Sequence, residues 1–230
     1  MTTNKIVALL PIKANSQRVK GKNFKPLHGK PLFRWILDTL LAIEDVDRVV
    51  INTDAREILA GNGLTDSDRV MIRDRKPELC GDNVSMNLIL ADDVAGLDAD
   101  CYLMTHATNP FLSTDTILEG LRMFKEKIQT GEADSVFTVN KIQTRFYRED
   151  CSAVNHDPDN LIQTQDLEPW YEENSNLYLF TKESFTATNA RIGKKPAMLI
   201  SPKFESIDID EPEDWEFAQI AAQYFDGRKM

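Results

Sequence analysis

A basic segment near the N-terminus holds the first side chains whose types and spacing could do chemistry. Residues 11–23 read PIKANSQRVKGKN, with four basic residues, Lys13, Arg18, Lys20 and Lys22, and no acidic one. The chain has a formal net charge of −10, yet its first 37 residues hold eight of the 27 basic residues and none of the 37 acidic ones. A polyanionic ligand would explain this local positive charge, because lysine and arginine neutralise phosphate oxygens.

The same segment has the features of a phosphate-binding loop. Gly21 allows close backbone approach, and the Ser16 hydroxyl and backbone N–H groups donate to phosphate oxygens. The segment is neither a P-loop nor a G-x-G-x-x-G loop, since both patterns are absent. Two interpretations remain, a triphosphate site and a solvated basic loop, and the lack of acidic residues favours the first.

A second candidate site lies near the C-terminus, where residues 206–215 read SIDIDEPEDW. Strand alternation would place Asp208 and Asp210 on one face, about 7 Å apart along the chain. Two such carboxylates can share a divalent cation, and beside a phosphate loop Mg²⁺ would bridge them to the phosphates. Alternatively, Asp210 or Glu211 caps a helix that starts near Pro212. Both interpretations can hold together, since a cap needs only one carboxylate.

The composition is typical of an ordinary globular protein, with 42% hydrophobic and 28% charged residues among 230. The acidic balance argues against a general nucleic-acid binder. No apolar run approaches the ~20 residues needed to span a bilayer, and the N-terminus fits a signal peptide poorly. The three cysteines are widely spaced and predict neither a disulfide framework nor a zinc site. We therefore predict a cytoplasmic protein without nucleic-acid or membrane partners.

Strand and helix patterns alternate over the first 140 residues. Apolar side chains at i, i+4 spacing predict a helix over 31–43, and Pro31 suits its first turn. The alternation implies βαβ units and a mainly parallel sheet, and ligands bind such sheets outside the carboxyl ends of the strands. The basic loop follows the first strand and is therefore well placed. Strands are expected over 5–12, 48–53, 69–73, 101–106 and 135–139, and further helices over 55–61, 85–96 and 114–128.

The periodic pattern breaks down over residues 140–174, which are polar and rich in turn residues. This stretch is too long for a plain loop, so we interpret it as a small subdomain, a lid or a dimerisation arm. Strands over 175–180 and 197–201 and a helix over 212–224 are expected to close the chain.

Six segments, taken together and in order, resemble the cytidylyltransferases that activate keto-sugar acids, the CMP-acylneuraminate (CMP-sialic acid) synthetase family, which is related to the CMP-Kdo synthetases. The resemblance covers nearly the whole chain and implies a Rossmann-like nucleotidyltransferase fold, α/β with a mainly parallel sheet flanked by helices. It implies one cytidylyltransferase domain over 1–230, with an inserted dimerisation arm at about 140–174. The matching segments are PIKANSQRVKGKN with PLHGKPLFRW, VVINTD, RKPEL with Asp82, HATNPFL, ENSNLYLF and SIDIDEPEDW.

The activity that this resemblance implies is the reaction of CTP with a sialic-acid-like 3-deoxy-2-keto sugar acid to give a CMP-sugar and pyrophosphate. The anomeric hydroxyl of the sugar attacks the α-phosphorus, Mg²⁺ assists, and the enzyme is a homodimer whose arm covers the partner's site. Three alternatives stay open: a CMP-Kdo-type synthetase for an eight-carbon sugar acid, a non-catalytic nucleotide-binding relative, and a glycosyltransferase. The basic loop argues against the last.

The resemblance also implies roles for residues around the nucleotide. Lys13 stands where the family usually has Arg and would contact the triphosphate, which loses a bidentate fork but keeps the charge. Ser16 and Lys22 match phosphate-binding positions, and Asn23 and Arg75 match positions that read the cytosine. Lys13 and Lys22 count as catalytic, because charge neutralisation dominates this kind of transfer. Arg18 and Asp82 complete the expected CTP-binding set.

Around the metal and the sugar, the resemblance implies five further residues. Asp208 and Asp210 match the Mg²⁺ ligands and count as catalytic. His106 stands where the family often has a sugar-contacting Gln, and such a histidine could titrate near neutrality. Asn109 and Asn174 complete the expected substrate-binding set. Leu112, where the family often has Arg, leaves the identity of the sugar open.

Other polar residues carry two interpretations each. Asp54 ends a strand and either serves the site or caps the next helix. Arg145 and Arg148 lie in the proposed arm, and one of them either binds the substrate carboxylate in bidentate fashion or faces solvent. His156, also in the arm, would touch sugar or solvent.

Overall fold

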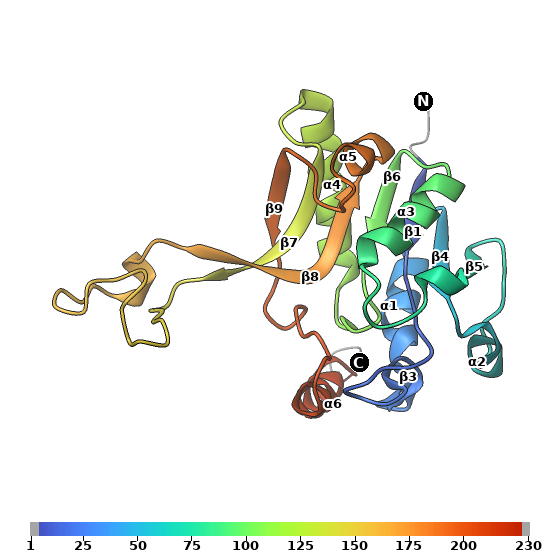
Figure 1. The fold of residues 1–230 in the computed structure, drawn as a ribbon, viewed down its shortest axis with the longest axis horizontal. Helices are drawn as coiled ribbons and strands as arrows, with labels where there is room; N and C mark the ends of the chain where they lie inside the picture. Colours follow the sequence, from blue (N-terminus) through green and yellow to red (C-terminus); the bar gives the residue numbers. More distant parts are fainter. Residues whose placement is uncertain (1–4, 227–230) are drawn as a thin grey trace.

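The fold is a seven-stranded sheet with helices on both faces, seen in a computed structural model that describes residues 5–226 (Figure 1). The strand order is β5-β4-β1-β6-β8-β7-β9. Only β8 runs against the other strands of this sheet, so the expected mainly parallel α/β architecture is confirmed. The strands are β1 (Ile6–Leu9), β4 (Arg48–Thr53), β5 (Val70–Asp74), β6 (Cys101–Met104), β7 (Ser135–Ile142), β8 (Trp170–Phe180) and β9 (Pro196–Ile200).

Helices cover both faces of the sheet. On α1, apolar residues at i, i+4 spacing are buried, as the sequence predicts, although Pro31 is the N-cap rather than part of the first turn. Ser113 caps α4 by accepting a hydrogen bond from the Thr116 backbone N–H. The helices are α1 (Leu32–Leu41), α2 (Arg56–Gly61), α3 (Met86–Gly96), α4 (Thr114–Thr130), α5 (Lys182–Thr188) and α6 (Pro212–Asp226). None of the helices in the described part of the chain has the length and apolar character needed to cross a membrane.

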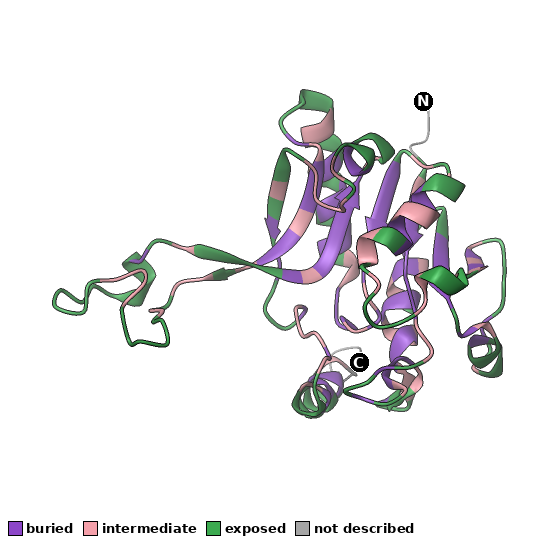
Figure 2. Ribbon diagram, viewed as in Figure 1, coloured by how far each residue is buried: buried purple, intermediate pink, exposed green. Residues whose placement is uncertain are grey.

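The core has two layers because the strands alternate their side chains between the faces. Figure 2 shows that the strands in the body of the sheet are largely buried. On β1, Ala8 belongs to the layer that α1 and α4 cover, whereas Val7 and Leu9 belong to the layer that α3 and α5 cover. A third cluster packs α6 against the N-terminal segment, and it contains Val19, Leu27, Leu32, Phe111, Ile209, Trp215, Ala218, Ala221 and Ala222. This cluster brings the residues just before α6 next to the basic loop.

The segment 140–174 contains more regular structure than its sequence predicts. The strand β7 continues to Ile142 and β8 begins at Trp170, and the two pair antiparallel out to these residues. Figure 1 shows this two-stranded ribbon leaving the body of the molecule and ending in irregular loops. We define the arm as residues 140–174. Most of its residues are exposed, so no alternation of buried and exposed side chains marks the strands in the sequence.

One further expectation about local structure needs correction, and two short elements were not predicted. Residues 206–211 do not form a strand, because they pair with no neighbouring strand of the sheet. The short helix α5 and the hairpin of β2 (Pro26–Leu27) and β3 (Lys30–Pro31) are absent from the sequence-based expectation. Both are too short for a hydrophobic period to reveal them, although Thr181 and Ser184 form a capping box at the start of α5.

Candidate active site

A cavity of about 590 Å³ lies at the carboxyl ends of β1 and β6 and beside the middle of β8. Ten of the twelve site residues expected from the sequence line it. They are Lys13, Ser16, Arg18, Lys22, Asn23, Arg75, Asp82, His106, Asp208 and Asp210. Because β8 runs against β6, its residue Ser175 meets this edge as well. The arm leaves the sheet at the same edge.

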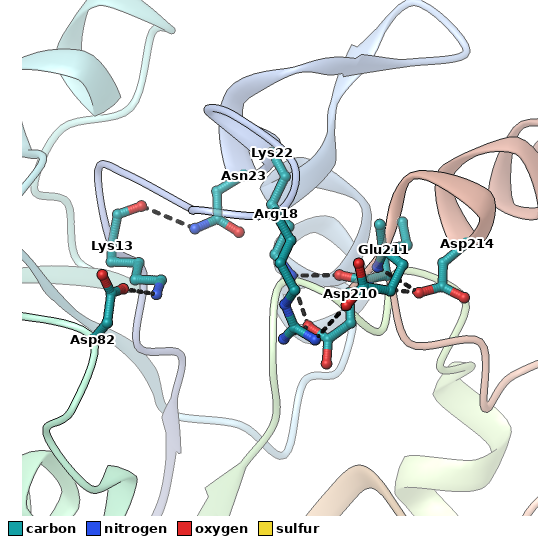
Figure 3. Close-up of polar contacts among 9 residues, drawn as sticks. Lys13, Arg18, Lys22, Asn23, Asp82, Asp210, Glu211 and Asp214 are labelled. Atoms are coloured by element: carbon teal, nitrogen blue, oxygen red, sulfur yellow. Dashed lines mark hydrogen bonds and ion pairs between the residues drawn. The ribbon is translucent and has the colours of Figure 1, made fainter.

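Lys13 pairs with Asp82 across the cavity wall (Figure 3). The Lys13 Nζ atom lies 2.8 Å from Asp82 Oδ1, and the Gln17 side-chain amide donates to the other carboxylate oxygen. The hydrogen bond from Lys13 is the main reason why the pKa of Asp82 lies below its usual range. An anionic ligand at Lys13 would therefore share this lysine with Asp82 or displace the carboxylate.

Side-chain hydrogen bonds to the backbone hold the basic loop in its curled shape. Asp54 Oδ1 accepts the Ala14 backbone N–H at 2.7 Å, and Asn23 Nδ2 donates to the Lys13 carbonyl at 2.9 Å. Asp54 thus holds the loop that lines the cavity, and the N-cap position of α2 is occupied by Ala55, which makes no side-chain hydrogen bond. The buried Ser16 Oγ has no partner among the described residues, so this hydroxyl is left for a ligand.

Lys22 and Arg18 tie the loop to the acidic segment before α6 (Figure 3). The buried Lys22 Nζ donates to the Ile209 carbonyl and lies 2.9 Å from Asp210 Oδ1. The Arg18 guanidinium lies 3.0 Å from Asp210 Oδ1 and 2.8 Å from Glu211 Oε1. Burial opposes ionisation of Asp210, but the hydrogen bonds and charges of Lys22 and Arg18 outweigh it and lower the pKa of this carboxyl. Asp210 is therefore an anion held in place.

Asp214 orders the acidic segment from inside α6. Its Oδ2 atom accepts the backbone N–H groups of Asp210 at 2.9 Å and Glu211 at 2.6 Å. The carboxylate that satisfies free N–H groups at this helix end is thus that of Asp214, and the two caps weighed from the sequence, Asp210 and Glu211, bind Arg18 instead.

Asp208 offers a carboxylate oxygen with no partner. Its Oδ1 atom is buried and unbonded within residues 5–226. Burial raises the pKa of Asp208, the negative charge of Asp210 adds to the rise, and a hydrogen bond with Thr108 opposes it. Adding a cation beside Asp208 and Asp210 would relieve both the unmet oxygen and the repulsion between the charges.

The two carboxylates fit a Mg²⁺ ion that also binds a phosphate ligand. Mg²⁺ prefers oxygen ligands and commonly takes one or two carboxylates together with phosphate oxygens and waters. The described residues contain no group of three or more His, Cys, Asp or Glu side chains placed to hold a metal. Asp208 and Asp210 would thus supply only part of the coordination shell, and a nucleotide triphosphate would supply more.

Arg75 is held rigidly at the cavity by the strands beneath it. Its Nε atom donates to Asn52 Oδ1 at 3.0 Å, and its Nη2 atom donates to the carbonyls of Asn52 and Ile12. Behind it, Asn52 donates to the buried Asp93 at 2.8 Å, whose pKa burial raises to about 6. Three oxygen acceptors thus fix one guanidinium, whose own pKa burial lowers.

Arg191 is a cavity residue that no sequence motif predicts. It lies on the segment between α5 and β9, and its Nη1 atom is 3.0 Å from His106 Nε2. Burial lowers the pKa of His106 to about 3, and the positive charge of Arg191 contributes. The expectation that His106 titrates near neutrality is therefore wrong. The ring is neutral, and its Nε2 accepts a hydrogen bond from Arg191.

Asn109 and Asn174 do not line the cavity. Asn109 is fully buried, and neither polar atom of its side chain has a partner among the described residues. The Asn174 amide donates to Asn140 Oδ1 and Ser201 Oγ, which ties β8 to its neighbours. Further polar lining residues not expected from the sequence are Gln17, Asn83, Thr108, Ser175 and Arg191. Gln17 and Thr108 lie within the quoted motifs, whereas Arg191 has no local signal.

The polar residues of the arm contact one another rather than this cavity. Arg145 Nη2 donates to the Ile162 carbonyl at 2.6 Å, and the His156 ring lies 2.9 Å from the Tyr147 hydroxyl. Arg148 bonds to Ser152. In this chain none of these arm side chains is among the cavity-lining residues.

Comparison with known proteins gives one family and several relatives. A family model described as "Cytidylyltransferase" matches residues 7–212. The chain is 27% identical to a CMP-N,N'-diacetyllegionaminic acid synthase of Legionella pneumophila over 94% of this chain and 95% of that protein. It is 25% identical to an N-acylneuraminate cytidylyltransferase of Escherichia coli over 98% of this chain, and it spans 54% of that relative. It is 23% identical to a 3-deoxy-manno-octulosonate cytidylyltransferase of Christiangramia forsetii over 94% and 96%.

Solved structures share the fold at low sequence identity. A 4-diphosphocytidyl-2C-methyl-D-erythritol synthase of Anaerococcus prevotii superposes with a TM-score of 0.66 at 14% identity, covering 96% of this chain and 97% of that one. A CMP:2-keto-3-deoxy-manno-octonic acid synthetase complexed with CTP superposes with a TM-score of 0.65 at 15% identity, covering 96% of this chain and 99% of that one.

The neutral state of His106 predicts how stability depends on pH. His106→Gln keeps an acceptor for Arg191 but removes the titrating ring. The pKa of His106 is about 3 in the folded chain, compared with 6.5 for an ordinary histidine in the unfolded chain. As the pH falls, the ring therefore takes up a proton in the unfolded chain first. The free energy of unfolding is therefore unaffected by His106 above pH 6.5. Below pH 6.5 protonation of the unfolded chain lowers it progressively toward pH 3, by at most about 1.4 kcal/mol per pH unit.

Urea denaturation of both proteins at several pH values, in the presence of a chelator, measures this effect. The wild type should lose more free energy of unfolding than His106→Gln between about pH 7 and pH 5. Parallel losses in the two proteins would contradict a neutral His106.

Proposed function

The chain belongs to the cytidylyltransferase family, and we propose that it activates a sialic-acid-like 3-deoxy-2-keto sugar acid with CTP, giving a CMP-sugar and pyrophosphate. The observation that carries this proposal is the cavity, where the basic loop and the carboxylates of Asp208 and Asp210 face the same space. The relatives named for legionaminic and acylneuraminic acids support the sugar-acid class. The alternatives are a CMP-Kdo-type synthetase, which the octulosonate relative supports, and a non-catalytic nucleotide-binding protein.

The basic loop would bind the triphosphate. Lys13, Arg18 and Lys22 line the cavity and supply positive charge, and the unpartnered Ser16 Oγ supplies a donor. All three cations are already paired with carboxylates, so the loop keeps its shape without ligand. In this proposal a triphosphate replaces part of these contacts with its own oxygens.

Fixed groups would read the cytosine and align the reaction. Arg75, held by backbone carbonyls and Asn52, and Asn23 of the loop would bind the base. The oxygen of the anomeric hydroxyl forms a bond to the α-phosphorus as the bond to pyrophosphate breaks, and the hydroxyl proton passes to water. Transfer of this kind depends mainly on positioning and charge neutralisation, which pre-ordered cations provide without reorganisation.

Asp208 and Asp210 would hold Mg²⁺ at the phosphates. When bound, this ion neutralises phosphate charge and orients the oxygens of the triphosphate. Asp210 stays ionised because Lys22 and Arg18 lower its pKa, and Asp208 contributes its unpartnered Oδ1.

We also propose that residues 1–230 form one cytidylyltransferase domain with the arm as an insertion, and that two chains form a homodimer. Residues 1–4 and 227–230 of that range lie outside the described part. The arm exposes several large apolar side chains, which a second copy would cover. They are Tyr147, Leu161, Ile162, Trp170 and Tyr171. Since the arm starts at the cavity edge, a dimer built through it would bring the partner near the site.

We further propose a cytoplasmic location and small-molecule partners only, without nucleic acid or membrane. The acidic composition and the free thiols Cys80, Cys101 and Cys151 support this assignment.

Pyrophosphate release tests the proposed activity directly. The purified protein is assayed with Mg²⁺, CTP and a panel of 3-deoxy-2-keto sugar acids of eight and nine carbons, with UTP, ATP and GTP as controls. We expect CTP-dependent release with at least one nine-carbon acid. Release with an eight-carbon acid alone would favour the Kdo-type alternative, and CTP binding without release by any acid would favour the non-catalytic one.

Removing either carboxylate charge tests the proposed metal ligands. Asp208→Asn and Asp210→Asn should each raise the Mg²⁺ concentration for half-maximal turnover by about tenfold or more, because each loses a charged oxygen ligand. Mn²⁺ binding in the presence of CTP, followed by electron paramagnetic resonance, should weaken in parallel. The control Glu213→Gln removes an exposed carboxylate nearby and should leave both readouts unchanged. Wild-type Mn²⁺ affinity in both variants would refute the assignment.

Sedimentation velocity tests the homodimer. The wild type should sediment with about twice the chain mass of 26.2 kDa. Leu161→Glu places a charge on an arm residue that is 61% exposed in the single chain, and it should shift the protein toward monomer. The control Leu118→Glu changes an exposed leucine on α4, which is 42% exposed, and should leave the mass unchanged. A wild type that sediments as a monomer at all concentrations would exclude the dimer.

A further inference from the structure

Arg191 occupies a different part of the cavity floor from the basic loop. The loop follows β1, whereas Arg191 contacts residues of β6 and β8, the next two strands of the sheet. The guanidinium contacts Met104 on β6 and the Tyr178 ring on β8, so it lies one to two strand spacings, roughly 5–10 Å, from β1, the strand that leads into the loop. The cavity thus has one cation at the end where β8 meets it, separate from the cluster for phosphates.

Charge balance distinguishes Arg191 from the loop cations. Lys13, Lys22 and Arg18 each have a carboxylate oxygen within 2.9 Å. For Arg191 the carboxylate contact is Glu173 at 3.4 Å, and the same Glu173 oxygen also accepts the Tyr178 hydroxyl. The Arg191 side chain is only 19% exposed, so water compensates little of its charge.

The surroundings of Arg191 fix its orientation and leave one edge open. Its Cζ atom lies 3.8 Å from the centroid of the Tyr178 ring, which holds the guanidinium plane by a cation–π contact. Nη1 faces His106 Nε2 and Met104 Sδ. Among the residues that the structure describes, Nη2 has only the long contact to Glu173, and Nε donates to none. The Nε and Nη2 edge presents two parallel N–H donors, the geometry that pairs with a carboxylate.

We propose that Arg191 binds the carboxylate of the sugar acid through its Nε and Nη2 edge and so makes the site selective for acids over neutral sugars. This inference rests on the proposed function, which supplies the sugar acid. A carboxylate entering this cavity meets the negative charges of Asp82, Asp208 and Asp210. It therefore needs a cation whose charge is only weakly compensated, and Arg191, which has a single long carboxylate contact, to Glu173 at 3.4 Å, is placed to provide one. The neutral His106 keeps Nη1 occupied and directs the free edge.

This assignment differs from the arm arginines considered from the sequence. The Nη2 atom of Arg145 already donates a hydrogen bond to the Ile162 carbonyl. Neither Arg145 nor Arg148 lines the cavity of its own chain. The carboxylate of the substrate would lie beside its anomeric carbon, so Arg191 would also orient the hydroxyl that attacks the α-phosphorus. The bound acid would then span from β8 to the carboxylates before α6.

The test compares each sugar acid that the wild type turns over with its C1 methyl ester, in the wild type, Arg191→Met and Arg191→Lys. The wild type should prefer the acid in kcat/KM. Arg191→Met should raise the KM for the acid by about 30-fold or more, as expected when one partner of a buried charged pair is removed. Its acid-to-ester preference should fall toward one, while the KM for CTP changes by less than about threefold. Arg191→Lys should recover part of the preference, since it keeps the charge without the fork.

The outcomes separate this inference from the function on which it rests. An unchanged acid-to-ester preference in Arg191→Met, with an active wild type, would overturn the role of Arg191 alone. An equal loss of acid and ester turnover with a lowered melting temperature would show a structural role instead and would also overturn it. A wild type that turns over no acid would overturn the proposed function and this inference together. The matched control Arg122→Met, on the outer surface of α4, should behave as wild type.

Discussion

The ion pairs between the basic loop and the acidic segment before α6 join the two ends of the chain into one site. Lys22 and Asp210 are 188 positions apart in sequence, yet their side chains meet at 2.9 Å. Arg18 strengthens the same contact through Asp210 and Glu211. Because Lys22 is buried, its charge requires these partners, and their loss would leave an uncompensated cation in the protein. The cavity and its charge pattern depend on this contact between the basic loop and the acidic segment.

The sheet holds the basic loop and the acidic segment at fixed positions. The loop leaves β1 at its carboxyl end, and the Asp54 carboxylate after β4 accepts the loop backbone at Ala14. The third apolar cluster, with Ile209 and Trp215, packs the C-terminal segment on the other side. Apolar burial thus sets the distance between the two charged segments, and the ion pairs set their orientation. A phosphate ligand would meet groups that are already ordered, which lowers the entropy lost on binding.

Charge is arranged in opposite pairs rather than as one basic patch. Lys13 faces Asp82, and Lys22 faces Asp210 beside Asp208. This pattern tolerates both an anionic triphosphate and a divalent cation, since each ligand finds its counter-charge in the same space. Arg191, held by the Tyr178 ring and by the neutral His106, has a longer carboxylate contact than these pairs, 3.4 Å to Glu173. It extends the positive region toward β8, where the arm begins.

The sequence by itself determined the fold class and most of the residues that the structure brings together at the cavity. Strong apolar periodicity marked helices such as α1, and β-branched runs marked strands such as β4. The acid-free loop with Ser16 and Lys22 predicted a phosphate site, and both residues line the cavity. Order along the chain was enough to place these groups, because parallel strands bring their carboxyl ends to one edge.

Only the tertiary structure decided the rest. Asp208 and Asp210 face the cavity through packing around Ile209 and bonds to Asp214, not through a strand. The arm strands carry no burial pattern, and the low pKa of His106 comes from burial and from Arg191, 85 positions away. Arg191 itself lies in a segment without a motif. These features arise from contacts between distant parts of the chain, and local residue patterns do not encode such contacts.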